Sequence, residues 1–180
     1  MTLATRILAI AAFAVVLATP AARAAAPLPT VPALDLDRYV GVWHEIARYP
    51  NRFQESCAGD VTATYTRNDD GTIGVVNACR KADGESMRAQ GVARMVAPPA
   101  TLAVRFAPAW LAWLPLVWGD YWVIDLAADY RYAVVGEPSR EYMWVLARDP
   151  RLADADWQRI VARLPALGYD PARLVRTPAS

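Results

Sequence analysis

The sequence has few of the residues on which metal sites and nucleophilic enzymes depend. Its 180 residues include one histidine, His44, and two cysteines, Cys57 and Cys79. These are too few for the tetrahedral ligand set of a typical zinc site. The sequence also contains no Gly-x-Ser-x-Gly elbow and no Walker-type loop. We therefore expect no metal ion, no cofactor and no catalysis, and interpret His44 as a surface residue of a strand.

An excess of either charge is also missing. The chain has 19 basic and 18 acidic residues, a formal net charge of +1. Residues 1–24, which we interpret below as a cleaved signal peptide, contain Arg6 and Arg23 but no acidic residue. Without them, 17 basic residues remain against 18 acidic ones. A nearly neutral chain lacks the electrostatic surface of a nucleic-acid-binding protein. We expect no nucleic-acid partner.

The apolar run at residues 7–17 is too short to span a bilayer as a helix, which takes about 20 residues. Arg6 precedes the run and Ala22-Arg23-Ala24 follows it, an arrangement typical of a cleaved export signal. We expect residues 1–24 to be this signal peptide. The proline-rich residues 25–36 predict an extended leader, and residues 37–180 a single domain.

Short alternating segments separated by turn residues dominate the rest of the chain. Val61, Ala63 and Tyr65 alternate with threonines, which predicts a half-buried strand. The predicted strands lie within residues 41–50, 61–66, 72–79, 87–96, 102–106, 121–126, 130–135 and 142–148. Eight strands with short connections favour an all-β fold, an up-and-down antiparallel barrel with room for one small ligand.

The last part of the chain changes to helical spacing. Its apolar stripe consists of Trp157, Ile160, Val161 and Leu164. Asp154 or Asp156 is expected to cap this helix, and Pro165 and Gly168 to end it. The stripe is predicted to pack outside the barrel, on the outer face of the last strand, formed by Met143, Val145 and Ala147.

Two cysteines in an exported chain are expected to form one disulfide. Cys57 is placed in a polar loop, residues 51–60, and Cys79 in the strand of residues 72–79. Closing a loop of this size would stabilise the fold by about 3 kcal/mol. The alternative is a reactive Cys79 thiol, since the alternation directs this side chain into the barrel.

Three motifs in order resemble the signatures of the lipocalin family. They are Gly41-x-Trp43, Asp129-Tyr130-Arg131-Tyr132 before a strand, and Arg148 at the end of YMWVLAR. The longer matches GVWHEIARYPNRF, TATYTRNDDGTIGVVN and EYMWVLARDP resemble its bacterial, apolipoprotein D-like branch, over about residues 35–176. The resemblance implies that Arg148 lies across Trp43 at the blunt end of the barrel. Glu45, on the face of Trp43, is expected to pair with Arg148 near this floor.

The resemblance also implies a ligand pocket on the inward face. Its expected residues are Tyr65, Asn77, Phe106, Tyr121 and Trp144. The implied function is binding and transport of a fatty acid or lysophospholipid in the bacterial cell envelope. Two alternatives remain: an isomerase-like lipocalin enzyme that uses the Cys79 thiol, and a structural envelope protein whose barrel is filled by its own side chains. The oligomeric state stays open.

Relatives in this branch are often outer-membrane lipoproteins, tethered through a cysteine at the cleavage site. No cysteine precedes Cys57 here, so we expect a periplasmic protein, with association with the outer membrane left open.

Residues 110–118, WLAWLPLVW, are an apolar connection between two predicted strands. Pro115 argues against a central strand. Three hypotheses follow: Trp110, Trp113 and Trp118 complete the pocket as a lid, they contact a membrane surface, or the loop packs on the protein's own outer surface.

Overall fold

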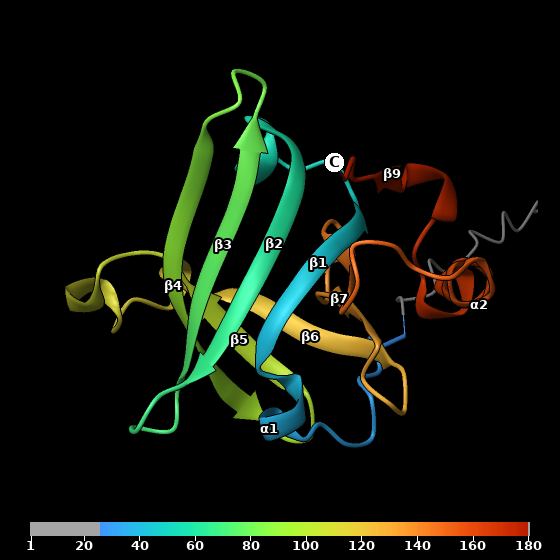
Figure 1. Cartoon of the computed structure of the whole chain (residues 1–180). Helices are drawn as coiled ribbons and strands as arrows, with labels where there is room; N and C mark the ends of the chain where they lie inside the picture. The colour runs from blue at the N-terminus through green and yellow to red at the C-terminus, as the bar shows by residue number, and fades with distance from the viewer. Residues whose placement is uncertain (1–25, 180) are drawn as a thin grey trace, which may run out of the picture.

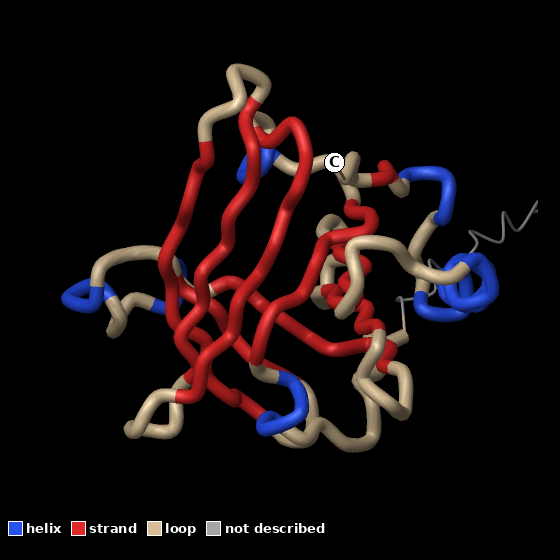
Figure 2. The backbone as a smooth tube through the Cα atoms, in the orientation of Figure 1, coloured by secondary structure: helices blue, strands red, loops and turns tan. Residues whose placement is uncertain are grey.

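The structure, a computed structural model, describes residues 26–179. The predicted signal peptide lies outside the described residues. Eight antiparallel strands close into one barrel, and a helix lies outside it near the end of the chain (Figures 1 and 2). The strands are β1 (Gly41–Arg48), β2 (Cys57–Arg67), β3 (Ile73–Lys81), β4 (Ser86–Ala97), β5 (Thr101–Arg105), β6 (Gly119–Leu126), β7 (Tyr132–Gly136) and β8 (Met143–Ala147), with a short β9 (Val175–Arg176).

The strands form an up-and-down meander that closes on itself. Each of β2 to β7 pairs with the next strand along the chain, β8 pairs with β1, and β1 also pairs with β2. Because consecutive strands alternate in direction, the β1–β2, β3–β4, β5–β6 and β7–β8 loops share one end of the barrel. The predicted fold class is confirmed.

Several predicted strand limits differ from the structure, three of them with a clear local cause. β2 begins at Cys57 rather than Val61, because Cys57 and Gly59 pair with Lys81 and Arg80 across two irregularities of register. The predicted polar loop is correspondingly shorter. β7 begins at Tyr132, since Tyr130 has a φ of 66°, which a strand does not accommodate. β5 ends at Arg105, one residue before Phe106.

The helix α2 (Asp154–Arg163) packs against the outer face of β8, as predicted. Ile160 and Leu164 are fully buried in one cluster with Met143, Val145 and Ala147. The chain then continues through the 3₁₀ helices η4 (Leu164–Leu167) and η5 (Pro171–Arg173).

The predicted side-chain cap of α2 is wrong. The N-cap is Ala153, which offers no side-chain hydrogen bond. Asp156 instead accepts two hydrogen bonds from the Arg131 guanidinium, at 2.7 and 2.6 Å. Its carboxylate therefore ties the helix to the β6–β7 turn rather than to its own first amides.

The segment before β1 packs onto the barrel. Leu28 and Val31 are buried, and the Val31 amide donates to the Val123 carbonyl at 2.9 Å. The short helix α1 (Leu36–Tyr39) follows; its N-cap Asp35 accepts from two backbone amides. α1 lies across the lower end of the barrel in Figure 1. Across residues 26–179, every helix falls short of the length and hydrophobicity needed to cross a membrane.

Trp43 and Arg148 close this lower end. Trp43 is fully buried, and its indole Nε1 donates to the Tyr39 carbonyl at 2.7 Å. The Arg148 guanidinium carbon lies 3.9 Å from the indole centroid. The guanidinium donates to the carbonyls of Arg38, Tyr39, Val40 and Val42. One side chain thus satisfies several carbonyls at the end of α1 and the start of β1.

Gly41 is required at this position. Its φ is +103°, and a Cβ there would lie 3.1 Å from Arg148 Nη1. Any larger residue is strained and crowds the guanidinium. The Gly-x-Trp motif is therefore explained by the geometry of the barrel end.

Replacement of Trp43 by alanine should lower the free energy of unfolding by about 3–5 kcal/mol, since a large aromatic side chain is lost from a packed site. Arg148→Ala should cost less, because the cation–π contact contributes about 1–2 kcal/mol. Urea unfolding of both variants measures these changes. An Arg148→Ala variant of undiminished stability that no longer binds ligand would contradict this role.

Candidate ligand-binding cavity

The barrel encloses a cavity of about 770 Å³. It is closed at the Trp43 end and opens at the end that carries the β1–β2, β5–β6 and β7–β8 loops. All five residues predicted to face it, Tyr65, Asn77, Phe106, Tyr121 and Trp144, contribute to its lining. Most of the remaining wall is apolar, including Val61, Ala63, Ile73, Val75, Met87, Leu102, Val104 and Leu146.

Three tyrosine hydroxyls form a cluster on the inner surface. The Tyr121 hydroxyl lies 2.7 Å from that of Tyr39 and 2.9 Å from that of Tyr65. Tyr121 and Tyr65 come from strands, where alternation predicts their direction. Tyr39 comes from α1, and sequence reasoning missed it because no strand periodicity applies there.

Burial keeps these hydroxyls protonated. It raises the pKa of Tyr65 to about 12, against the smaller lowering effect of its bond with Tyr121. Burial likewise raises the pKa of Tyr39 and of Tyr121 well above the usual value. Tyr39 and Tyr65 add to the rise at Tyr121, whereas at Tyr39 the charge of Tyr65 adds to it and the hydrogen bond with Tyr121 opposes it. The cluster is thus a neutral group that can donate and accept hydrogen bonds.

Asn77 supplies a second polar group on the wall. Its Oδ1 is buried and has no hydrogen-bond partner in the described part of the chain. The residue lies on β3 between Val75 and Cys79, which also line the cavity. An unpaired amide oxygen in an apolar wall is costly unless a ligand or water binds it.

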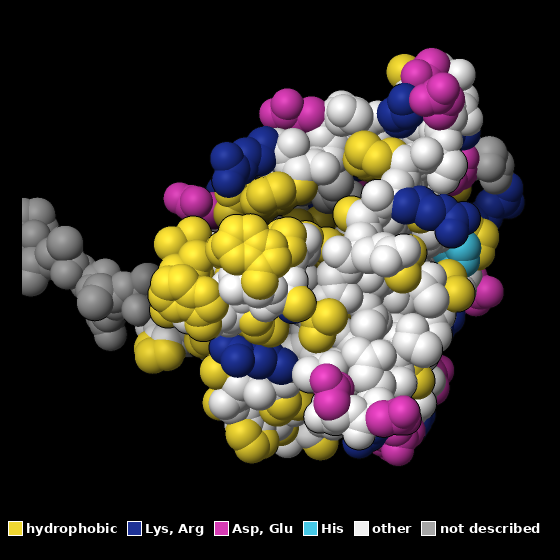
Figure 3. Space-filling model, turned by 90° about the vertical axis from the view of Figure 1, so that its left-hand side faces the viewer, with side chains coloured by type: hydrophobic (Ala, Val, Ile, Leu, Met, Phe, Trp, Pro, Cys, Tyr) yellow, Lys and Arg dark blue, Asp and Glu magenta, His cyan; other side chains and the backbone are white. Residues whose placement is uncertain are grey.

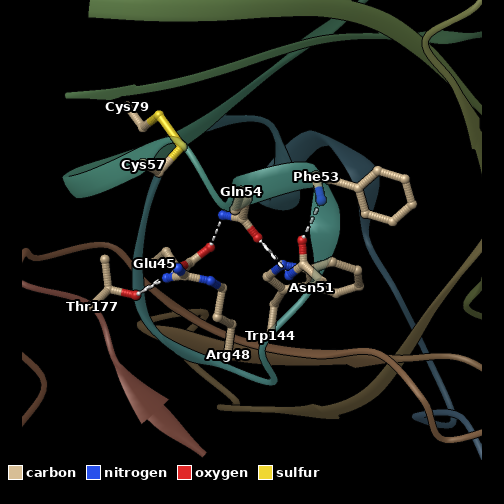
Figure 4. Close-up of a disulfide and its surroundings, with 9 residues drawn as sticks. All are labelled: Glu45, Arg48, Asn51, Phe53, Gln54, Cys57, Cys79, Trp144 and Thr177. Carbon is tan, nitrogen blue, oxygen red and sulfur yellow. Dashed lines mark hydrogen bonds and ion pairs between the residues drawn. A yellow bond between two sulfur atoms is a disulfide. The ribbon is translucent and has the colours of Figure 1, made fainter. Parts of the chain in front are cut away.

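A hydrogen-bonded network crosses the mouth, centred on Gln54 of the 3₁₀ helix η1 (Arg52–Gln54) (Figure 4). The Gln54 amide donates to Glu45 Oε2 at 2.5 Å. Its Oε1 accepts from Asn51 and from the Trp144 indole, each at 2.9 Å. The network holds the β1–β2 loop against β8. Sequence reasoning missed Gln54, since loop residues carry no periodicity.

The predicted Glu45–Arg148 pair is wrong. Glu45 faces inward as predicted, but accepts from Arg48 at 2.9 Å and from Thr177 Oγ1 at 2.5 Å, besides Gln54. β1 carries Trp43 at the closed end and rises toward the mouth, so Glu45 lies beyond the reach of Arg148. Thr177 follows β9, which pairs with β1 at Ala47 and Arg48.

Cys57 and Cys79 form the predicted disulfide, with Cα atoms 5.6 Å apart. It joins β2 to β3 beside the mouth (Figure 4). Cys79 is buried and lines the cavity, so its inward direction is also as predicted. Since both cysteines of the chain are bonded, the reactive thiol required by the isomerase-like alternative is absent.

Phe106 and the β5–β6 loop form the outer rim. Phe106 lines the cavity but is 44% exposed, because it lies just beyond β5. The loop contains the 3₁₀ helices η2 (Ala109–Leu111) and η3 (Pro115–Val117). Trp118 lines the cavity, whereas Trp110 and Trp113 do not and are exposed. A lid of three tryptophans is thus not formed, and packing on the protein's own surface does not account for Trp110 and Trp113.

His44 is half-buried on β1, where it pairs in register with Thr62 and Ala147. No group of three or more His, Cys, Asp or Glu residues within residues 26–179 could hold a metal ion.

Thiol titration of the unreduced protein should detect no free cysteine. Reduction should lower the free energy of unfolding by about 3 kcal/mol, because it restores the entropy of the 22-residue loop in the unfolded chain. A Cys57→Ala/Cys79→Ala variant is the control, and should be as stable as the reduced protein. Two reactive thiols before reduction would contradict the disulfide.

The tyrosine cluster should make stability depend on alkaline pH. An unfolded tyrosine titrates near pH 10, while Tyr65 in the folded protein titrates near 12. Between these values the folded state binds more protons, so the free energy of unfolding falls as pH rises, by about 1.4 kcal/mol per pH unit for one such group. Below about pH 10 the contribution is complete. Urea unfolding across this range should show a shallower decline in Tyr65→Phe; an identical decline would contradict the assignment.

The family model of the Lipocalin-like domain matches residues 34–179. Temperature-induced lipocalin-1 of Arabidopsis thaliana is 39% identical over 157 residues, covering 85% of this chain and 83% of that protein. The outer membrane lipoprotein Blc of Escherichia coli K12 is 34% identical over 142 residues, covering 78% and 77%. Bovine (Bos taurus) apolipoprotein D is 33% identical over 135 residues, covering 69% and 66%.

Solved structures agree with the fold. Insecticyanin from the tobacco hornworm Manduca sexta superimposes with a TM-score of 0.64 at 20% identity, covering 84% of both chains. The cockroach allergen Per a 4 gives 0.65 at 19% identity, covering 84% of this chain and 93% of the allergen. The closed eight-stranded barrel, the Gly41–Trp43–Arg148 arrangement and these matches lead to one conclusion: the chain belongs to the lipocalin family, whose members bind small hydrophobic ligands.

Proposed function

We propose that the protein binds and carries a fatty acid or lysophospholipid in the bacterial cell envelope, without catalysing a reaction. The cavity of about 770 Å³ is the observation that supports this most directly. Its volume falls within the range of roughly 300–1,000 Å³ typical of small-molecule sites. A barrel filled by its own side chains would leave no such space.

The apolar wall suits an acyl chain. Each methylene removed from water contributes about 0.8 kcal/mol. A sixteen-carbon chain therefore gains about 12 kcal/mol before the cost of immobilising it, which is several kcal/mol. Dissociation constants in the micromolar range or below are expected.

The polar groups inside the cavity can orient such a ligand. Two hydrogen bonds join the hydroxyls of Tyr39, Tyr121 and Tyr65, so one of the three hydroxyl protons has no partner within the cluster. That proton can be donated to an oxygen atom of a ligand, and Asn77 Oδ1 can accept a hydrogen bond from a ligand hydroxyl or ammonium group.

Charges around the cavity favour a zwitterionic head group over a lone carboxylate. The charged lining residues are Arg52 and the acids Glu45, Asp120 and Glu137. A fatty-acid carboxylate would meet one cation among several carboxylates. A lysophospholipid head carries both a phosphate for Arg52 and an ammonium group for Asp120, whereas Glu45 and Glu137 already accept hydrogen bonds within the chain. We infer that lysophospholipid is the better of the two ligands.

The envelope location rests on the relatives and on the predicted export signal. Several of the similar proteins are named outer membrane lipoproteins. Together with the signal pattern of residues 1–24, this favours the periplasm. The non-enzymatic role is favoured by the disulfide, which occupies the cysteine that the enzyme alternative needs.

Delipidated protein should bind monomeric lysophosphatidylcholine and palmitate saturably, with a change in tryptophan fluorescence. Trp144→Ala should weaken binding by about 1 kcal/mol or more, because the indole forms part of the wall. Trp110→Ala is the matched control, since Trp110 is exposed and lies outside the cavity lining.

Absence of saturable binding by either lipid would contradict the proposed function. Tighter binding of palmitate than of lysophosphatidylcholine would contradict only the preference for a zwitterionic head group.

A further inference from the structure

We propose that the rim of the cavity docks onto the surface of a phospholipid bilayer. The docking surface consists of the exposed apolar residues Phe53, Phe106, Trp110, Trp113 and Leu116. This inference goes beyond ligand binding and does not depend on which molecule occupies the cavity.

The docking surface is unusually apolar for a part of the chain in contact with water. Trp110, Trp113 and Leu116 are 73%, 75% and 83% exposed. No charged residue occurs in residues 106–119. Figure 3 shows hydrophobic side chains gathered on the face that this loop occupies, beside a hollow in the surface. Contiguous exposed patches of this kind mark contact surfaces, and indole rings favour the membrane interface.

Several backbone amides of the loop that carries these side chains form hydrogen bonds within the loop itself. Within it, Leu111, Ala112 and Leu114 donate their amides to carbonyls three residues earlier, at 2.9–3.0 Å. The Trp118 indole donates to the Ala112 carbonyl of the same loop at 2.8 Å, and its ring contacts Arg94 of β4. Satisfied backbone groups reduce the cost of leaving water, so the loop is suited to an apolar interface.

Charge at the base of the docking surface complements phosphate. The Arg94 guanidinium lies 4.0 Å from the Trp118 ring centroid, and that of Arg52 lies 5.2 Å from the Phe53 ring centroid. Both arginines are exposed, and neither forms an ion pair within residues 26–179. The exposed tryptophans can enter the apolar part of a bilayer interface, while the unpaired guanidinium groups of Arg52 and Arg94 contact the lipid phosphates.

The docking surface is continuous with the cavity. Phe53, Phe106 and Leu116 are exposed, yet each also lines the cavity. A bilayer in contact with these residues therefore lies at the mouth. A hydrophobic ligand would pass between lipid and barrel with less exposure to water than by release into solution.

A second copy of the chain is the competing occupant. A two-fold contact joins a surface to itself and would bring the arginines of both copies to one interface. Phospholipid supplies the opposite charge instead, which is why we assign the surface to a bilayer.

Co-sedimentation with vesicles of phosphatidylcholine and phosphatidylglycerol tests the proposal. Trp110→Ser/Trp113→Ser should lower partitioning by roughly tenfold or more, since two large apolar side chains are lost. Val42→Ser/Val96→Ser is the matched control, because it removes two exposed apolar side chains away from the mouth and should leave partitioning unchanged. Arg52→Gln/Arg94→Gln should lower partitioning roughly threefold or more, with the larger loss on phosphatidylglycerol-rich vesicles.

Circular dichroism and binding of monomeric lysophosphatidylcholine, measured on each variant, separate this proposal from the proposed function. Retained ligand binding with lost vesicle binding in Trp110→Ser/Trp113→Ser supports docking. Equal vesicle partitioning of this variant and the wild type would overturn it, whether or not ligand binds. A different result is a wild-type protein that fails to bind vesicles and forms dimers that the tryptophan substitutions dissociate. That result would overturn the proposal in favour of a second copy of the chain.

Discussion

The stacking of Arg148 on Trp43 is the interaction on which the rest of the structure depends. A barrel of eight strands needs a closed end if it is to hold an apolar molecule away from water. The indole fills this end, and the guanidinium binds the carbonyls where α1 meets β1. β1 pairs with both β8 and β2. Fixing the first residues of β1 therefore also positions the two strand pairings that close the barrel.

The two ends of the barrel are built on opposite principles. The floor is closely packed around the buried Trp43, and it carries the neutral hydroxyls of Tyr39, Tyr65 and Tyr121 next to the Trp43 layer. The mouth is held by polar contacts around Gln54 and by the disulfide, and its rim is apolar. Polar contacts fix the loops there without filling the space between them, so a cavity remains accessible.

Alternation was sufficient to predict the inward residues that lie within strands. Tyr65 and Asn77 face the cavity because side chains on a strand alternate between two faces. Phe106 was harder, since it lies just past β5 and is shared between cavity and solvent. Tyr39 and Gln54 could not be predicted at all: one lies in a short helix and the other in a loop, and only the folded chain brings them to the cavity. Glu45 shows a further limit of this reasoning. Alternation predicts that the side chain faces inward, but not its position along the barrel axis, and so not its partner.

The sequence by itself determined the fold class, the family signatures at the closed end of the barrel, the outer helix and the disulfide. These follow from local periodicity, from turn residues and from the scarcity of cysteine. The tertiary structure alone decided the partners of each polar group and the exposure of the apolar loop. Asp156 binds Arg131 rather than capping its helix, and Trp118 turns to the barrel while Trp110 and Trp113 face solvent. The physical reason is that periodicity constrains the direction of a side chain, whereas pairing and exposure depend on which distant segments pack beside it.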